Sequence, residues 1–261
     1  MLFPIGDDDR ALSGRAVVTL VLVIANIAVF GLQLADPAVT YGWSVVPREI
    51  TTGADLVNAR PLPFEDPAAD VRTPADIPQR PGPGGAPLIF LTVLTAMFMH
   101  GGWGHLGGNL LYLWIFGDNV EHSFGPGPFL LFYLGAGIAA TLVQVAMDPD
   151  GLVPNLGASG AISGVLGAYL VLFPRNRVHV IVLFVVVSLP AFLVLGLWIA
   201  TQYLNGFGAV APTEETGGIA YGAHVGGFVA GAALALVARV LGLGERSSAL
   251  SPAMTRDAHT R

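Results

Sequence analysis

Residues Pro154 to Leu170, "PNLGASGAISGVLGAYL", form an apolar run built almost entirely from small side chains. Ser159 stands inside a Gly-x-Ser-Gly, and Gly160 and Gly164 would share one face of a helix. Small residues at this spacing let membrane helices approach one another closely. The stretch therefore predicts a tightly packed membrane helix. It leaves open whether Ser159 is a packing residue or a nucleophile.

The composition predicts an integral membrane protein. Of the 261 residues, 53% are hydrophobic and 11% are charged, whereas an average soluble domain has roughly 25% charged residues. The net charge of -6 argues against a nucleic-acid partner. The chain has no cysteine, which excludes disulfides, thiolate metal sites and cysteine catalysis.

Six segments are apolar enough to be membrane spans, since a span needs about 20 mostly apolar residues and fewer where it is surrounded by protein. They are Ala16 to Leu34, Gly104 to Phe116, Pro128 to Met147, Ala158 to Phe173, Val178 to Leu204 and Ala223 to Leu243. We expect an all-α, polytopic bundle of six transmembrane helices over residues 16–243, with tails at 1–15 and 244–261. Pro190 should kink the fifth helix, because proline removes one backbone hydrogen bond.

A long polar segment, residues 35–87, separates the first two spans. It includes "RPLPFEDPAADVRTPADIPQRPGPGGAP", whose prolines and acidic residues predict a large loop or a partly ordered insertion. The following "LIFLTVLTAMFMH" is apolar but short for a span. We expect this piece to form a helix near the interface or dipping into the outer leaflet.

Arginine placement predicts that both termini are cytoplasmic, because short loops rich in arginine stay inside. The acidic start "MLFPIGDDDR" is unlike a secretory signal, so the first segment is expected to be a retained span. With the N-terminus inside, the inside segments hold Arg10, Arg15, Arg175, Arg177, Arg239, Arg246, Arg256 and Arg261. The short outside loops, residues 148–157 and 205–222, hold no arginine.

This topology brings three distant segments to one depth. Ser159 opens the fourth helix, His224 the sixth, and His105 with Asn109 the second. A neutral imidazole near a serine hydroxyl can take its proton and later protonate a leaving amine. His105 and Asn109 lie four residues apart, so both can donate hydrogen bonds from one helical face to a developing oxyanion.

At these residues the chain resembles the rhomboid family of intramembrane serine proteases. The matching pieces are "HGGWGHLGGN" (His100 to Asn109), "GASG" (Gly157 to Gly160) and "AHVGGFVAG" (Ala223 to Gly231). The resemblance covers about residues 16–243. It implies that Ser159 is the nucleophile and His224 the general base. It also implies an oxyanion hole of His105, Asn109 and the Ser159 backbone N–H, and neither a metal nor another cofactor.

Two positions depart from the family pattern. Leu91 and Thr92 stand where many bacterial members have Trp-Arg, and Ser163 stands where some have an aromatic residue below the nucleophile. Ser163 is therefore a rival nucleophile. We favour Ser159, because Ser163 lies one turn, about 5.4 Å, deeper in the helix.

The remaining histidines carry weaker predictions. His100 is expected to order the loop or the helix start by hydrogen bonding. His122 is expected to be a solvated residue of a cytoplasmic loop.

The resemblance implies substrates that are themselves membrane proteins, cut in or near a transmembrane segment within the lipid bilayer. In the family, the fifth helix and the loop after it are proposed to admit substrate. A bare six-span core favours a bacterial inner membrane. One alternative is a rhomboid-like pseudoenzyme that binds membrane proteins. A less favoured alternative is a small-solute or metal transporter that uses His100, His105 and His224; the spans contain no carboxylate to bind a cation.

Overall fold

The computed structural model describes residues 3–8, 15–36, 38–54, 56, 88–207 and 220–242, and most of them are helical. The elements are β1 (Phe3–Asp7), α1 (Val17–Ala35), α2 (Ala38–Trp43), α3 (Pro47–Thr52), η2 (Leu88–Leu91), α4 (Thr92–Thr95), η3 (Ala96–Phe98), α5 (Trp103–Phe124), α6 (Pro126–Met147), α7 (Ser159–Leu172), β2 (Arg177–Val182), β3 (Val185–Pro190), α8 (Ala191–Phe207) and α9 (Tyr221–Val240). The predicted C-terminal tail, the loop after α8 and most of the first loop lie outside the described residues.

Each of the six predicted spans overlaps one helix of the bundle: α1, α5, α6, α7, α8 and α9. Among the described residues, three helices are long and apolar enough to cross a membrane, namely α1, α6 and α9, with mean hydropathies of 2.4, 1.9 and 1.6. The α7 and α8 helices are apolar but shorter. The short helical run from η2 to η3 occupies the segment that was expected to form a helix without spanning.

The prediction of one helix from Val178 to Leu204 is wrong. The first half of this segment forms the antiparallel hairpin β2–β3, and the helix α8 begins only at Ala191. Valine and isoleucine dominate the hairpin, and these β-branched residues favour strands, a preference that hydropathy alone does not detect. Pro190 is the last residue of β3, so it precedes the helix and does not kink it.

The helix of the second predicted span continues beyond the predicted end. Helix α5 reaches Phe124, so Asp118 and Glu121 belong to the same helix but lie outside the predicted span, Gly104 to Phe116. Glu121 is buried and accepts hydrogen bonds from the backbone N–H groups of Val18 and Thr19, at 2.9 and 2.7 Å. A carboxylate at this position satisfies the free N–H groups at the start of α1.

His122 is likewise a helix residue and not a loop residue. It lies near the end of α5, and its Nδ1 is 2.7 Å from the carbonyl oxygen of Asp118.

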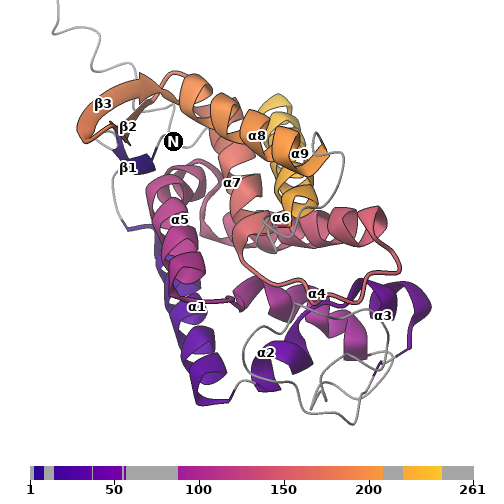
Figure 1. The fold of residues 1–261 in the computed structure, drawn as a ribbon. Helices are drawn as coiled ribbons and strands as arrows, with labels where there is room; N and C mark the ends of the chain where they lie inside the picture. Colours follow the sequence, from indigo (N-terminus) through magenta and orange to yellow (C-terminus); the bar gives the residue numbers. More distant parts are fainter. Residues whose placement is uncertain are drawn as a thin grey trace, which may run out of the picture.

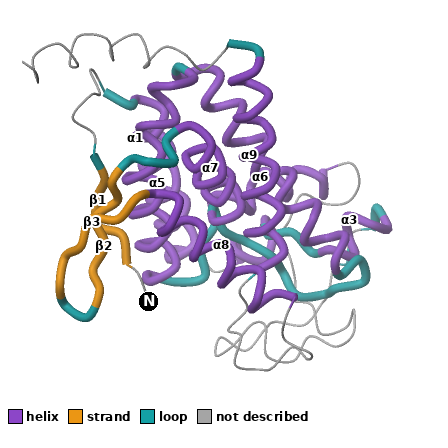
Figure 2. Tube along the Cα trace, turned by 90° about the horizontal axis from the view of Figure 1, so that it is seen from above, coloured by secondary structure: helices purple, strands orange, loops and turns teal. Residues whose placement is uncertain are grey.

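The N-terminal residues form a strand, which the sequence did not predict. Strand β1 pairs antiparallel with β2, giving a three-stranded sheet in the order β1-β2-β3. The Asp7 carboxylate accepts hydrogen bonds from Asn119 Nδ2, at 2.9 Å, and from the Tyr169 hydroxyl. These bonds tie the sheet to α5 and α7. In Figures 1 and 2 the sheet lies at one end of the molecule and α3 at the other.

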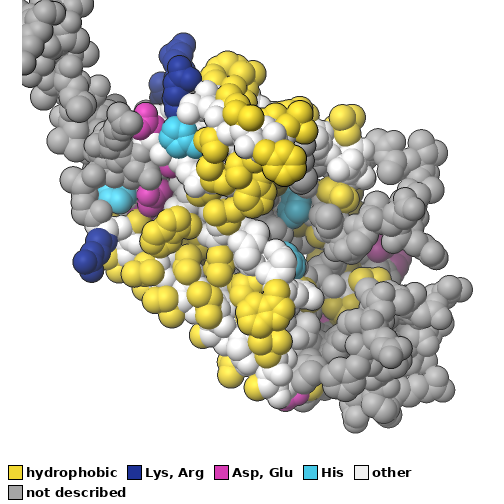
Figure 3. Space-filling model, turned by 60° about the vertical axis from the view of Figure 1, so that its left-hand side comes forward, with side chains coloured by type: hydrophobic (Ala, Val, Ile, Leu, Met, Phe, Trp, Pro, Cys, Tyr) yellow, Lys and Arg dark blue, Asp and Glu magenta, His cyan; other side chains and the backbone are white. Residues whose placement is uncertain are grey.

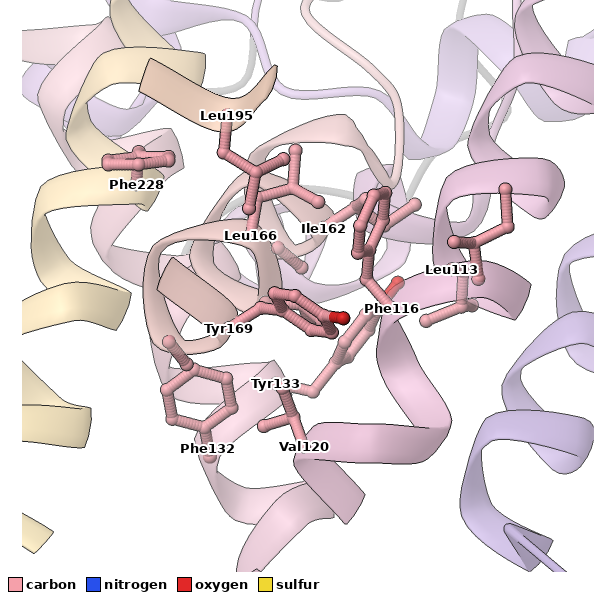
Figure 4. Close-up of a cluster of buried hydrophobic side chains, with 14 of the residues drawn as sticks. Leu113, Phe116, Val120, Phe132, Tyr133, Ile162, Leu166, Tyr169, Leu195 and Phe228 are labelled. Atoms are coloured by element: carbon pink, nitrogen blue, oxygen red, sulfur yellow. The ribbon is translucent and has the colours of Figure 1, made fainter. Parts of the chain in front are cut away.

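Helix α7 forms the centre of the bundle, and every residue from Gly160 to Tyr169 is buried. Aromatic and aliphatic side chains of α5, α6 and α8 surround it, and Figure 4 shows Phe116, Tyr133 and Leu195 among them, close to Tyr169 of α7. The outer surface is also apolar. In Figure 3 hydrophobic side chains cover much of the described face, whereas arginine side chains lie at its margin. This distribution fits a bundle surrounded by lipid.

Candidate active site

Ser159 is the first residue of α7 and is half-buried. Its rival Ser163 lies one turn further into the helix and is only 2% exposed. The Ser163 hydroxyl donates a 2.6 Å hydrogen bond to the Ser159 carbonyl oxygen, a common use of a helical serine. Of the two hydroxyls, the one at Ser159 therefore has the better access to a substrate.

The loop before Ser159 is held by backbone hydrogen bonds to segments that lie between α1 and α5. Asn155 and Val45 exchange two backbone hydrogen bonds, of 2.7 and 3.0 Å, and the Gly157 N–H donates to the Ala96 carbonyl at 2.8 Å. Thr92, at the position where many bacterial members have arginine, is completely buried and bonds to the Ile89 carbonyl at 2.5 Å. Backbone pairing thus anchors the first loop in this chain.

A glycine seam joins α7 to α9, as the sequence predicted. A β-carbon at Gly227 would lie 2.1 Å from the Gly160 carbonyl oxygen, and one at Gly231 would lie 2.0 Å from that of Gly164. Only glycine permits backbones to approach so closely. Gly160 follows Ser159, and a β-carbon there would be 3.8 Å from the β-carbon of Ala223, the residue before His224. The seam therefore brings the Ser159 and His224 segments together.

His224 is held by a side chain that sequence reasoning missed. Its Nδ1 is 2.7 Å from Oε1 of Gln202 on α8. Since an amide oxygen only accepts, Nδ1 carries the proton and Nε2 keeps a free lone pair in the neutral ring. The Trp198 ring, also on α8, lies 6.0 Å from the His224 ring at an interplanar angle of 35°. An aromatic residue of α8 thus packs near the histidine, while Ser163 occupies the position below Ser159.

His105 has the opposite tautomer. Its Nδ1 accepts a 3.2 Å hydrogen bond from the Gly101 N–H, so Nε2 carries the proton in the neutral ring. A β-carbon at Gly157 would lie 2.9 Å from His105 Nε2 and 3.5 Å from Ser159 Oγ. These two side chains therefore face the same small space. Gly157 has a φ of +130°, so glycine is required there for both conformation and room.

Asn109 lies one helical turn after His105 on the same face of α5. It is buried, and its Nδ2 has no hydrogen-bond partner among the described residues. Buried amide donors are nearly always paired. A buried donor without a partner is therefore suited to bind a ligand oxygen.

His100 orders the start of α5 through its backbone and not through its ring. The Gln33 side chain of α1 accepts from the His100 N–H at 2.9 Å and donates to its carbonyl at 3.1 Å. The His100 ring is 2% exposed, and within the described part of the chain neither ring nitrogen has a partner. Burial, with a smaller contribution from His105, lowers the pKa of His100 to about 4. The ring is therefore neutral at pH 7.

Three glutamines support the site, and the sequence search missed them because it considered only ionisable groups. Gln33 holds the His100 loop, Gln202 holds His224, and Gln144 of α6 accepts from the Ala223 N–H at 3.1 Å. An amide in an apolar helix is costly unless it is hydrogen-bonded. Glutamine in the apolar helical segments was therefore the feature of the sequence that could have predicted these supporting contacts.

A cavity of about 30 Å³ lies beside Ser159 and is lined in part by Thr141, Gln144 and Ala223. It is large enough for a water molecule. No group of three His, Cys, Asp or Glu side chains within the described ranges is arranged to hold a metal ion.

The family model described as "Rhomboid domain" matches residues 89–240, more than half of the chain. The chain belongs to the rhomboid family. This rhomboid protein is 38% identical over 145 residues to "Rhomboid protease GluP" of Bacillus subtilis, covering 55% of the chain and 26% of that relative. It is 32% identical over 145 residues to "Rhomboid protein 1, mitochondrial" of Saccharomyces cerevisiae, covering 54% and 40%. The match therefore spans less than half the length of either relative.

A further relative is "Putative rhomboid protease YdcA" of Bacillus subtilis, 38% identical over 87 residues, which are 33% of the chain and 43% of that relative. All the predicted site residues fall inside the segment that matches the rhomboid model. The rhomboid protein is thus a mostly helical membrane protein, and its predicted site lies in the family's own domain.

Proposed function

We propose that this rhomboid protein is an intramembrane serine endopeptidase that uses Ser159 and His224 as its catalytic pair. The observation that carries the proposal is the pair of hydrogen bonds made by the Nδ1 atoms of two histidines, from which we assign opposite tautomers. Gln202 leaves His224 Nε2 free to accept a proton, and Gly101 leaves His105 Nε2 protonated and able to donate. One histidine suits a general base and the other suits an oxyanion donor.

In the proposed first step, Ser159 Oγ attacks the carbonyl carbon of the scissile peptide bond while its proton moves to His224 Nε2. The carbonyl oxygen becomes an oxyanion and accepts hydrogen bonds from His105 Nε2–H, Asn109 Nδ2–H and the Ser159 backbone N–H. Collapse of this intermediate breaks the C–N bond, and His224 returns the proton to the leaving amine. An acyl-enzyme on Ser159 remains.

In the second step, a water molecule attacks the acyl-enzyme with His224 again as base, and the carboxylic acid product leaves Ser159 free. The cavity next to Ser159 provides room for this water. Gln202 acts as a positioning residue, since its bond to His224 Nδ1 holds the ring and leaves Nε2 free to accept the proton of the Ser159 hydroxyl. The arrangement is a dyad oriented by a neutral amide.

We propose six membrane-spanning helices, α1 and α5 to α9, with both termini cytoplasmic in a bacterial inner membrane. The arginines near β2 and at the end of α9 support this orientation. A cysteine at Asp150 should then react with an impermeant maleimide in intact cells, and one at Arg175 only after the membrane is opened. The reverse pattern would place the Ser159 loop inside the cell.

The proposed substrates are membrane proteins cut within or beside a transmembrane segment. A helical peptide bond is shielded by its own hydrogen bonds, so the scissile region must unwind before Ser159 can reach it. Glycine and other poor helix formers near the cleavage site should favour this. The apolar exterior of the bundle supports a substrate that arrives through the bilayer.

The test is cleavage of a model single-span protein by the purified enzyme in lipid vesicles. Wild type and Ser163→Ala should produce the cleaved fragments, whereas Ser159→Ala and His224→Ala should not. Circular dichroism of each variant checks that the fold is retained. If the wild type binds the substrate without cleaving it, the pseudoenzyme alternative replaces the proposal. Equal cleavage by wild type and Ser159→Ala would refute the mechanism.

A further inference from the structure

The hairpin β2–β3 ends in a two-residue connection, Leu183–Phe184, that is almost completely exposed. Leu183 is 87% exposed and Phe184 is 97% exposed. Both residues have positive φ, 45° and 72°. Figures 1 and 2 show the hairpin projecting away from the helices.

Neither residue is suited to this turn in water. Two-residue hairpin connections with positive φ at both positions favour Asn-Gly or Asp-Gly, because β-branched and bulky side chains are strained in that region. In water, the exposed Leu183 and Phe184 side chains would also carry the cost of hydrating large apolar surfaces. An apolar environment around the tip would remove this second cost.

Exposure on both faces of the hairpin indicates what that environment is. Val185 and Val186 are 61% and 58% exposed, and successive strand residues point to opposite faces. A protein docked on one face would leave the other face in water. Lipid chains can cover both.

The apolar character begins at a defined point along the hairpin. At its base, Arg177 is exposed and donates to the Ser188 carbonyl at 3.1 Å, and His179 pairs with the Ser188 hydroxyl at 2.7 Å. Beyond the His179–Ser188 pair, three cross-strand pairs lead to the tip, and all six residues are Val or Ile. At about 3.3 Å per residue these pairs span about 10 Å.

The tip is continuous with the lipid-facing surface of the bundle. Strand β3 leads directly into α8, whose Phe192, Leu193 and Leu197 are exposed. No described strand pairs with the outer edge of β3. Unpaired backbone groups exclude deep insertion into hydrocarbon, but they are tolerated at the interface, where apolar groups insert about 5–10 Å.

We propose that the hairpin tip, residues 182–187, is a membrane anchor that inserts into the headgroup and acyl-chain boundary of the leaflet at the sheet end of the bundle. Arg177 lies at its base, where its guanidinium group can bind a lipid phosphate. The anchor holds the start of α8 at the membrane surface. The proposal does not depend on proteolytic activity.

The test uses the natural absence of cysteine. A Phe184→Cys variant of the full chain is labelled with the fluorophore NBD and reconstituted in vesicles of phosphatidylcholine and phosphatidylglycerol. Its emission should be blue-shifted, and lipids with a nitroxide in the acyl chain should quench it. The matched control is Arg175→Cys at the exposed base of the hairpin, which should show water-like emission and little quenching.

A second variant separates insertion from folding of the hairpin. Leu183→Asn with Phe184→Gly gives the turn its preferred residues, and Val186→Cys then carries the label. Quenching at Val186→Cys should be strong with the natural tip and weak with Asn-Gly. If the labelled tip is water-exposed, the proposal is overturned. A blue shift without lipid quenching that grows with protein density would also overturn it, because a second copy would then cover the tip.

Discussion

Gly227→Ala is expected to disturb the geometry between the Ser159 hydroxyl and the His224 ring without replacing either residue. Gly227 lies one turn after His224 and packs against Gly160, the residue after Ser159. A β-carbon at position 227 would be 2.1 Å from the Gly160 carbonyl oxygen and 3.2 Å from the Ala140 β-carbon. Real β-carbons do not approach other atoms closer than 3.0 Å, so α7 and α9 must separate by about 0.9 Å.

A separation of this size acts mainly on catalysis. Misplacement of reacting groups by about 1 Å can cost about 100-fold in rate, and we expect kcat/KM to fall by about this factor. Overpacking typically costs about 1–3 kcal/mol of stability, partly offset by the gain of about 0.5–1 kcal/mol when alanine replaces glycine in a helix. The fold should therefore survive.

The assay compares kcat/KM for a single-span substrate in vesicles with thermal unfolding in detergent. The control is Gly135→Ala in α6, where a β-carbon would meet no atom of the described residues within 4 Å. That variant should cleave normally. If Gly227→Ala also cleaves at the wild-type rate, close approach of α7 and α9 does not set the geometry of Ser159 and His224, and the argument from the seam is refuted.

Three further predictions concern the groups around the serine. His224→Ala should abolish cleavage, whereas Asn109→Ala should lower kcat by about 10²- to 10³-fold, because other oxyanion donors remain; equal and total loss would make Asn109 a structural residue. Gln202→Leu removes one hydrogen bond of about 1 kcal/mol and should lower kcat about fivefold while KM stays unchanged. The pH–rate profile should also change, and Gln202→Glu should restore part of the activity. A raised KM alone would assign Gln202 to substrate binding. Gln33→Leu leaves the buried His100 backbone unpaired and should reduce the free energy of unfolding by about 1–3 kcal/mol; unchanged denaturation in detergent would contradict this role.

The sequence predicted the helices where apolar runs coincided with small-residue spacing. The glycine faces of α7 and α9 are the clearest case, because close helix contacts need glycine at every fourth residue on both partners. The common depth of Ser159, His224, His105 and Asn109 was predicted from the membrane topology and stays a prediction. Their catalytic roles remain predictions.

The predictions from the sequence were wrong where hydropathy was the only criterion. Residues 178–190 are as apolar as a membrane span but form a hairpin. Their β-branched side chains favour strands, and a turn interrupts the segment, so its apolar length did not predict a helix correctly. Helix α5 continued past the end of its apolar run because Glu121 finds buried partners at the start of α1. Gln202 was missed because the sequence reasoning considered only ionisable groups, and the order of residues does not show that α8 faces His224. That contact exists only in the folded bundle.

The most direct measurement of the central claim is to locate the covalent adduct of a serine-directed fluorophosphonate on the chain in vesicles. Peptide mass spectrometry of the labelled wild type should find the phosphonate on Ser159, and Ser163→Ala should give the same adduct. Labelling should be lost in Ser159→Ala and nearly lost in His224→Ala, because the hydroxyl reacts only when the imidazole can take its proton. An adduct on Ser163, or equal labelling of wild type and Ser159→Ala, would contradict Ser159 as the nucleophile.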